Sequence, residues 1–174
     1  MAHRDVRELD RDLERSSAVE ALYRTHYVAM ARTARLLIGN REEGEEIAQD
    51  AFVALYRGWD RLRDKELCVP YLRTSVVNLA RGRMRRASLA RRHPPSVEPP
   101  EDPPEPGPGA QELAALRAAL KGLPPRQREA VVLRFFAGLD EVEVAVAMGI
   151  SPGALKSHLH RAKTALGQKL EAYR

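Results

Sequence analysis

A proline-rich, acidic segment near the middle of the chain most constrains how this sequence can fold. Residues 94–109 read PPSVEPPEDPPEPGPG and hold eight of the chain's twelve prolines, four acidic residues and no large hydrophobic residue except Val97. Such a segment cannot bury enough apolar surface to fold, and proline-rich chains stay extended and semi-rigid. We therefore predict a flexible linker over residues 93–110 between two independently packed units. A surface loop within one unit is the alternative.

The composition on both sides of this segment favours helices over sheets. Ala, Leu, Arg and Glu are abundant, whereas the chain has one Trp and three Phe. A length of 174 residues allows two small domains. The sequence thus predicts an all-α fold with a polar N-terminal arm at residues 1–16, a three-helix bundle at 17–92 and a four-helix domain at 111–174.

Capping signals locate the helices of the first unit. Ser17 and Asn40 are each followed three residues later by Glu, which is the spacing of a capping box. Pro70 is suited to open a third helix after a loop at residues 60–69. The three predicted helices span residues 17–38, 41–58 and 71–86.

Glycine and proline residues divide the second unit into four helices. Asp140 and Glu143 form another capping-box pair, and Ser151 is a good N-cap with Pro152 at the first helical position. A short helix, a turn that contains Gly149 and a longer basic helix together predict a helix-turn-helix. The four predicted helices span residues 112–121, 125–136 and 141–148, and run from 152 onward.

Two stretches without acidic residues indicate contact with nucleic acid. The formal net charge of the chain is +5, but its distribution is more informative. Residues 71–93 hold seven arginines, residues 144–170 hold four Lys or Arg, and neither stretch contains Asp or Glu. A solvated helix normally intersperses acidic residues among basic ones, so both stretches are candidates for DNA contact.

The last helix has an apolar side and a polar side. At about 100° per residue, the apolar residues Leu155, Leu159, Ala162 and Leu166 cluster inward. The outward residues can donate to phosphates or base edges, although an ordinary solvated face is the alternative. These outward residues are Gly153, Lys156, Ser157, His160, Arg161 and Thr164.

The third helix of the first unit is arranged similarly. Its apolar side is predicted to be core, and a stripe on its opposite side is suited to follow a nucleic-acid strand. Tyr71, at the helix start, has two interpretations that stay open: a surface for stacking an unpaired base, or a core contact with Trp59. The stripe consists of Thr74, Asn78, Arg81 and Arg85.

The second helix combines an apolar face with an acidic outer face. Glu42, Glu46, Gln49 and Asp50 are unsuited to DNA and suit a basic protein partner, and Val53 among them is an exposed apolar residue of the kind that often marks a contact. The predicted core face consists of Gly44, Ile47, Ala48, Ala51, Phe52, Leu55 and Trp59.

Three segments together resemble a known family. EEIAQDAFVALYRGW, VPYLRTSVVNLARGRMRR and LPPRQREAVVLRFFAGLDEVEVAVAMGISPGALKSHLHRAKTAL resemble, in that order, the region-two and region-four segments of extracytoplasmic-function sigma factors of the sigma-70 family, in the SigE-like subgroup. The resemblance covers about residues 18–171. It implies a protein that directs RNA polymerase to promoters, opens DNA and starts transcription.

The resemblance also implies roles for particular residues. The loop at residues 60–69 matches the one that captures a flipped base. His158 and Ala154 stand where many relatives have Arg and Thr, so promoter preference does not transfer. The matched sets are a polymerase-binding set of Glu46, Gln49, Asp50, Val53 and Arg57; a minus-ten set of Asn78, Arg81, Arg85 and Arg86; and a minus-thirty-five set of Ser151, Gly153, Lys156, Ser157, His160 and Arg161. Thr74 of the stripe and Tyr71 at the helix start are added to the predicted minus-ten set.

The implied partners are core RNA polymerase, through the clamp helices of its largest subunit and its β flap, promoter DNA, and an anti-sigma factor. The sequence predicts no cofactor, metal or catalytic residue. His158 and His160 lie about 200° apart around a helix and cannot share a metal. The single cysteine, Cys68, and an N-terminus without an apolar stretch favour the cytoplasm and no membrane contact. A stand-alone helix-turn-helix regulator that binds operators as a dimer is the main alternative.

Overall fold

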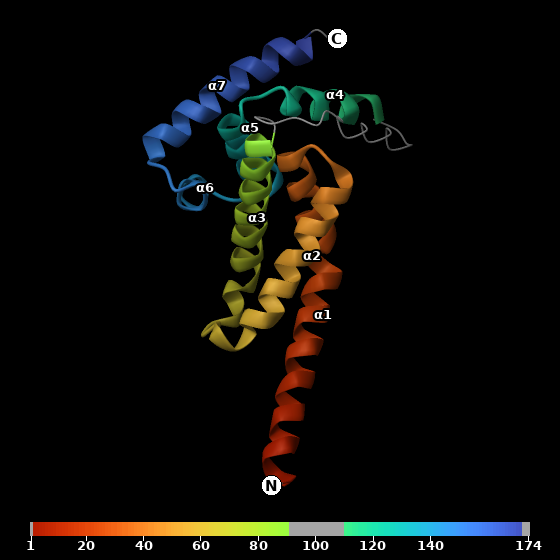
Figure 1. Ribbon diagram of the computed structural model, residues 1–174. Helices are drawn as coiled ribbons and strands as arrows, with labels where there is room; N and C mark the ends of the chain where they lie inside the picture. Colours follow the sequence, from red (N-terminus) through yellow and green to blue (C-terminus); the bar gives the residue numbers. More distant parts are fainter. Residues whose placement is uncertain (1, 91–109, 172–174) are drawn as a thin grey trace.

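The computed structural model describes residues 2–90 and 110–171, and the regular elements within these ranges are all helices (Figure 1). The predicted all-α class is therefore confirmed. The helices are α1 (Ala2–Ile38), α2 (Arg41–Gly58), the 3₁₀ helices η1 (Trp59–Arg61) and η2 (Lys65–Leu67), α3 (Cys68–Ala90), α4 (Ala110–Lys121), α5 (Pro125–Val131), the π-helical turn η3 (Val132–Phe136), α6 (Glu141–Met148) and α7 (Pro152–Glu171).

Helices α1, α2 and α3 form the predicted three-helix bundle. The α2 N-cap is as predicted, since the Asn40 side chain accepts a hydrogen bond from the backbone N–H of Glu43 at 3.0 Å. Helix α1 crosses α2 so closely at Gly44 that a Cβ there would lie 2.8 Å from backbone atoms of Arg35. The predicted core residues of α2 are buried, except for the half-buried Trp59. A fully buried leucine such as Leu55 stabilises the bundle by roughly 1.5–3 kcal/mol.

Helices α4 to α7 form the predicted four-helix unit. The Asp140 carboxylate accepts from the backbone N–H of Glu143, and the Glu143 carboxylate accepts from that of Asp140, each at 2.8 Å. Gly149, with φ of 62°, ends α6 in the left-handed conformation and begins the turn into α7. The helix-turn-helix is therefore confirmed. The predicted helix at 125–136 differs in one respect, because it widens into the π turn η3 after Val131.

Two predicted helix starts are wrong. Helix α1 begins at Ala2 and passes through Ser17 without a break, so Ser17 is no N-cap. The reason is tertiary: Arg15 and Ser16 contact the side chain of Tyr56 on α2 at 3.3 and 3.4 Å, which supports helix in the predicted polar arm. Helix α3 begins at Cys68, before Tyr71, because the buried Cys68 side chain anchors an extra turn.

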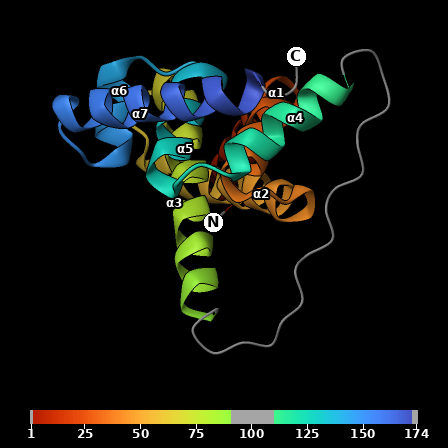
Figure 2. The ribbon, with the colours of Figure 1, turned by 90° about the horizontal axis from the view of Figure 1, so that it is seen from above.

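The two bundles pack against one another, a contact that the sequence did not predict. Figure 1 shows α4 to α7 gathered at the end of the molecule opposite the N-terminus, and Figure 2 shows α5 beside α3, with α7 across it. Helix α1 contacts α4, α5 and η3, and buried side chains of both bundles form one cluster. The reason lies in α5, whose buried Arg128 and Glu129 find partners on α3. Residues 91–109 of the predicted linker lie outside the described residues.

Candidate polymerase and nucleic-acid interfaces

The predicted polymerase-binding residues share the outer face of α2. The core side of this helix faces α1 and α3, so the opposite side is left to solvent. Val53 is 45% exposed although it is apolar. The Glu46 carboxylate pairs with Arg83 Nη2 of α3 at 2.8 Å, so this face is braced from a neighbouring helix. The exposed residues of this docking face are Glu46, Gln49, Asp50, Val53 and Arg57.

The α3 stripe, consisting of Thr74, Asn78, Arg81 and Arg85, lies on one side of α3 as predicted, but it faces the second bundle. Thr74, Asn78 and Arg85 are exposed, whereas the Arg81 side chain is 27% exposed. Arg81 Nε pairs with the Glu129 carboxylate of α5, which is itself 3% exposed. Arg126 reaches the other oxygen of that carboxylate at 3.2 Å. Arg81, the cation at the middle of the stripe, is therefore already paired with Glu129.

Two clefts flank this ion pair between the bundles. One, of about 450 Å³, is lined by Asn78, Arg81 and Arg85 of α3 and by Pro125, Arg126 and Glu129 of α5. The other, of about 410 Å³, places Thr74, Asn78 and Arg81 opposite residues of α6 such as Glu143 and Val146. The nitrogen Nη2 of Arg81 is buried and makes no hydrogen bond within the described residues. A cleft therefore borders the α3 stripe on each side of Arg81, and Thr74, Asn78 and Arg85 stay exposed.

Tyr71 and Arg86 lie at opposite ends of the predicted minus-ten set. Tyr71 is half-buried and packs against the core, as does Trp59. Its hydroxyl lies 3.6 Å from the position of a Cβ built on Gly58, so the phenol points toward the end of α2. Arg86 is exposed near the end of α3. The packing of Tyr71 agrees with the core interpretation and leaves part of its ring accessible.

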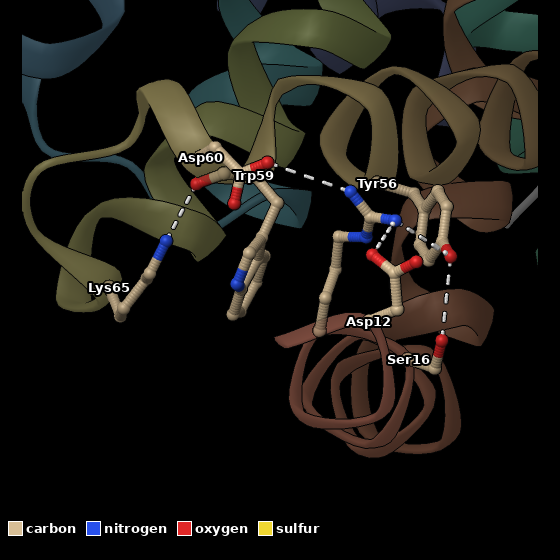
Figure 3. A network of polar contacts seen from close by, with 7 residues as sticks. Asp12, Ser16, Tyr56, Trp59, Asp60 and Lys65 are labelled. Carbon is tan, nitrogen blue, oxygen red and sulfur yellow. Dashed lines mark hydrogen bonds and ion pairs between the residues drawn. The ribbon is translucent and has the colours of Figure 1, made fainter. Parts of the chain in front are cut away.

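The α2–α3 loop, residues 59–67, begins with η1 and ends with η2. Neither short helix contributes a fully buried side chain. Lys65 Nζ lies 4.2 Å from the centre of the Trp59 ring and donates to the Trp59 carbonyl at 2.6 Å (Figure 3). The side chain of Asp64 caps η2 through the N–H of Glu66 at 2.9 Å. The loop is therefore shaped by polar contacts on the surface of the bundle.

The outward residues of α7 are all exposed, whereas Arg81 of the α3 stripe is partly buried. Leu155, Leu159 and Ala162 are buried on the inner side, as predicted. Ser151 caps the helix by accepting from the N–H of Ala154 at 3.2 Å. Apart from the neighbouring backbone of α7, no atom lies within 4 Å of a Cβ built on Gly153, so the space in front of it is open. The exposed residues of this α7 face are Gly153, Lys156, Ser157, His160, Arg161 and Thr164.

Local hydrogen bonds hold part of the α7 face in place. Ser157 Oγ donates to the carbonyl of Gly153 at 3.1 Å, and Arg161 Nε donates to the carbonyl of Ser157 at 3.2 Å. These bonds turn the Arg161 guanidinium back along the helix and leave its terminal nitrogens free to bond elsewhere. Lys156 and His160 are exposed beside it. The face therefore offers several donors and no acidic side chain.

Two residues at these surfaces were not anticipated from the sequence: Glu129, which pairs with Arg81, and Arg15, which contacts Tyr56 and Asp60. Both contacts join residues more than 40 positions apart, so no local pattern signals them. Burial raises the pKa of the Cys68 thiol, which keeps it protonated. In the described part of the chain, no group of three His, Cys, Asp or Glu is placed to hold a metal ion.

Family models match both bundles. The model for Sigma-70 region 2 matches residues 22–90, and that for Sigma-70, region 4 matches residues 113–166. The first covers the docking face, the α2–α3 loop and the α3 stripe, and the second covers the helix-turn-helix. Of the helices in the described ranges, none is long and apolar enough to cross a membrane.

Curated relatives share this organisation along almost the whole chain. The RNA polymerase sigma-E factor of Streptomyces avermitilis is 34% identical over 99% of this chain and 90% of its own length. The ECF RNA polymerase sigma factor SigM of Mycobacterium tuberculosis is 33% identical over 88% of this chain and 77% of its own. The chain belongs to the extracytoplasmic-function sigma factors of the sigma-70 family, which serve RNA polymerase in transcription initiation.

Solved structures share the fold. The sigma factor RpoE of Bartonella quintana, solved with the anti-sigma factor NepR, superposes with a TM-score of 0.70 at 21% identity, over 89% of this chain and 98% of RpoE. CnrH, solved with the cytosolic domain of CnrY, has a TM-score of 0.62 at 24% identity, over 92% of this chain and 97% of CnrH. At such identities the likeness concerns the fold.

Proposed function

We propose that this sigma factor works by binding alone, through three surfaces that act in turn. The docking face of α2 binds the clamp helices of the largest polymerase subunit, while the second bundle binds the β flap. The α7 face reads the minus-thirty-five element as duplex. The α3 stripe and the α2–α3 loop then hold the opened minus-ten strand. No residue has a covalent role, and the place of action is the cytoplasm, where polymerase and promoters are.

The observation that carries this proposal is the exposed, acid-free α7 face of the helix-turn-helix. A helix of this kind enters the major groove with its N-terminal residues toward the bases. Ser151 and Gly153 open the helix without bulk, and a phosphate is well placed near its first backbone N–H groups. Lys156, His160 and Arg161 follow along the groove-facing side. Their side chains supply both phosphate contacts and contacts to base edges.

DNA opening on α3 requires a change in the arrangement of the two bundles. The positions that give the minus-ten and minus-thirty-five elements their names differ by ~25 base pairs, which is about 85 Å at 3.4 Å per base pair. Helix α7 packs on α5, which is only about 10 Å long, and the Arg81–Glu129 ion pair joins α3 to the same helix. Helices α3 and α7 cannot reach both elements from this arrangement. We therefore propose that the described structure is a closed state, in which Glu129 substitutes for the DNA strand on Arg81.

The closed state is poised to open. Arg81 Nη2 makes no hydrogen bond within the described residues, so this donor is available to a new acceptor. A phosphate on the α3 stripe would satisfy this nitrogen, while Glu129 would be hydrated. Polymerase, by binding the two bundles at separate places, would provide the free energy that separates them.

An anti-sigma factor is a further proposed partner. The relatives RpoE and CnrH were solved with an anti-sigma factor and with the cytosolic domain of CnrY, respectively, and both share the fold of this chain. Such a partner would act on this chain by covering the docking face or the DNA-reading helices. This proposal rests on the fold likeness alone.

DNA binding with and without core polymerase tests the proposed function. We expect the purified chain with core enzyme to bind and transcribe a subset of a genomic promoter library, and the free chain to bind the same DNA weakly and without preference. Tight, sequence-specific binding of a dimer of the free chain, unchanged by polymerase, would support a stand-alone regulator and contradict the proposal.

A further inference from the structure

The α2–α3 loop needs a fixed shape to capture a base, yet it has little core of its own. Its residues Asp60, Lys65 and Leu67 are exposed, and Leu67 is 52% exposed although it is apolar. The contacts of Lys65 with Trp59 close the loop upon itself. They do not fix the loop relative to α3, whose stripe must lie beside the same DNA strand. Trp59 and Leu62 pack in part against the core, and the exposed Asp60 between them is the point where a residue outside the loop also contacts its first half.

Arg15 of α1 reaches the loop from a distant part of the chain. Its Nη1 lies 3.6 Å from Oδ2 of Asp60, the second residue of the loop. Its side chain is only 19% exposed, although it belongs to a helix whose neighbouring side chains are mostly in solvent. Figure 3 shows the partners of Arg15, which are Asp12 on α1, Tyr56 near the end of α2 and Asp60 on η1. Arg15 thus connects α1 with η1.

The Arg15 guanidinium is held in place before it meets Asp60. Its Nη2 donates to Asp12 at 2.7 Å and to the Tyr56 hydroxyl at 3.3 Å, and its central carbon lies 4.3 Å from the centre of the Tyr56 ring. The Tyr56 hydroxyl lies 3.4 Å from Ser16 Oγ. Hydrogen bonds with Ser16 and Arg15 lower the pKa of Tyr56. A side chain ordered in this way loses little further entropy when it binds an exposed carboxylate.

We propose that Arg15 is a positioning residue for capture of the opened promoter strand, acting through Asp60 on the α2–α3 loop. The first turns of α1, which the region 2 match at residues 22–90 does not include, serve to hold Arg15. This inference rests on the proposed function, since it assumes that the loop receives a base. It assigns a role to a segment that lies outside the three surfaces described above.

The test measures base discrimination by the holoenzyme. For wild type, Arg15→Ala, Asp60→Ala and the double variant, transcription from a promoter with the preferred base at the captured position is compared with transcription from its three substitutions. We expect each single variant to lower the discrimination ratio about three- to fivefold, which is the upper range for an exposed ion pair. The double variant should lose no more than either single one. Affinity for core polymerase should stay unchanged.

Matched variants separate positioning from general damage. Arg11→Ala removes a cation one turn earlier, from an exposed site on the same helix, and should leave discrimination at the wild-type value. Arg15→Lys keeps the charge but loses the planar set of donors of the guanidinium, so its discrimination ratio should lie between those of Arg15→Ala and wild type. If Arg15→Ala lowers the melting temperature, Asp60→Ala carries the test alone, because its side chain is 78% exposed.

The outcomes distinguish this inference from the proposed function. Full discrimination in Arg15→Ala and Asp60→Ala, or additive losses in the double variant, would overturn the role of Arg15. If Asn78→Ala still lowered transcription from the preferred promoter in the same assay, the proposed function would stand, and only the role of Arg15 would be lost. If no variant of the loop or of the α3 stripe changed opening or discrimination, the proposed function itself would fail.

Discussion

The α7 face and the α3 stripe carry the same kinds of side chain, yet they have different surroundings. The α7 face is exposed along its length, and its residues bond mainly to their own helix. The α3 stripe faces the second bundle, and its central cation, Arg81, is paired with Glu129. A surface that reads duplex DNA can stay open, because its target is always available. If the α3 stripe binds unpaired DNA, as proposed, its target exists only after opening, and until then Glu129 pairs with Arg81 while Thr74, Asn78 and Arg85 stay exposed.

If both surfaces act only within the polymerase complex, as proposed, the largest effect is expected on the docking face. Replacing Asp50 and Val53 together with Arg should weaken binding to core polymerase by more than about a hundredfold, since it places two cations on a surface suited to a basic partner. Co-purification with core enzyme measures this loss. Val28→Arg, at a valine that is 75% exposed on α1, is the control and should bind normally. Undiminished binding of the double variant would contradict the account of α2.

The α7 face should separate into residues that position and residues that specify. Arg161→Ala or His160→Ala should cost about 1–3 kcal/mol on the preferred site and relax preference at one base. Lys156→Ala should instead weaken binding to all sequences and lower the salt slope by about one. Holoenzyme binding to minus-thirty-five variants across a salt series measures both effects.

A control for the α7 face is available on the same helix. Lys163 lies 5.5 Å from the centre of the Phe135 ring, so its ammonium is directed toward the protein. Lys163→Ala should change neither base preference nor the salt slope. Wild-type behaviour of the Lys156, His160 and Arg161 variants would show that the face is an ordinary solvated one.

The α3 stripe should matter at a later step than the α7 face. Asn78→Ala removes an exposed amide from the stripe and should reduce open-complex formation by roughly tenfold, the equivalent of ~1.4 kcal/mol, while initial promoter binding stays near wild type. Permanganate reactivity of unpaired thymines reports opening. Ser88→Ala, exposed on α3 beyond the stripe, should open normally. An equal loss at both steps would remove the distinction between the two surfaces.

The smallest effect is expected from releasing the covered surface. Glu129→Gln keeps the shape of the side chain but removes the charge that holds Arg81, so it should raise the affinity of the free chain for single-stranded minus-ten DNA by about three- to tenfold. The same change should lower stability by about 1–3 kcal/mol, because Arg81 and Arg126 would lose charge-assisted hydrogen bonds to the carboxylate. Glu141→Gln, on the exposed side of α6, should do neither.

Local patterns in the sequence predicted most of the fold. Asn40, Asp140 and Gly149 act at the helix ends where their side-chain chemistry or conformational freedom indicates, because a cap involves only its neighbours along the chain. Ser17 has the same local signal as Asn40 and does not cap. There, contacts of Arg15 and Ser16 with Tyr56 support a continuous helix. Local propensity is a weak prior that tertiary packing overrides.

The sequence predicted which residues share a helix face, but not which residues of the other bundle they contact. Helical periodicity separated the stripe of Asn78 and Arg81 from the apolar side of α3, and the structure has that separation. The partner of Arg81 could not be deduced, since Glu129 is one of many acidic residues and lies 48 positions away. The packing of one bundle on the other, which buries Glu129, depends on complementary shape over many residues.

The distance between the two bundles in the free chain and in the holoenzyme tests the central claim most directly. Labels at Val28 on α1 and Val142 on α6, two strongly exposed positions, report this distance by energy transfer or electron spin resonance. The account predicts one short distance in the free chain and a distance longer by tens of ångströms on promoter DNA, where the elements lie about 85 Å apart. The same distance in both states, or a long and broad distribution in the free chain, would contradict it.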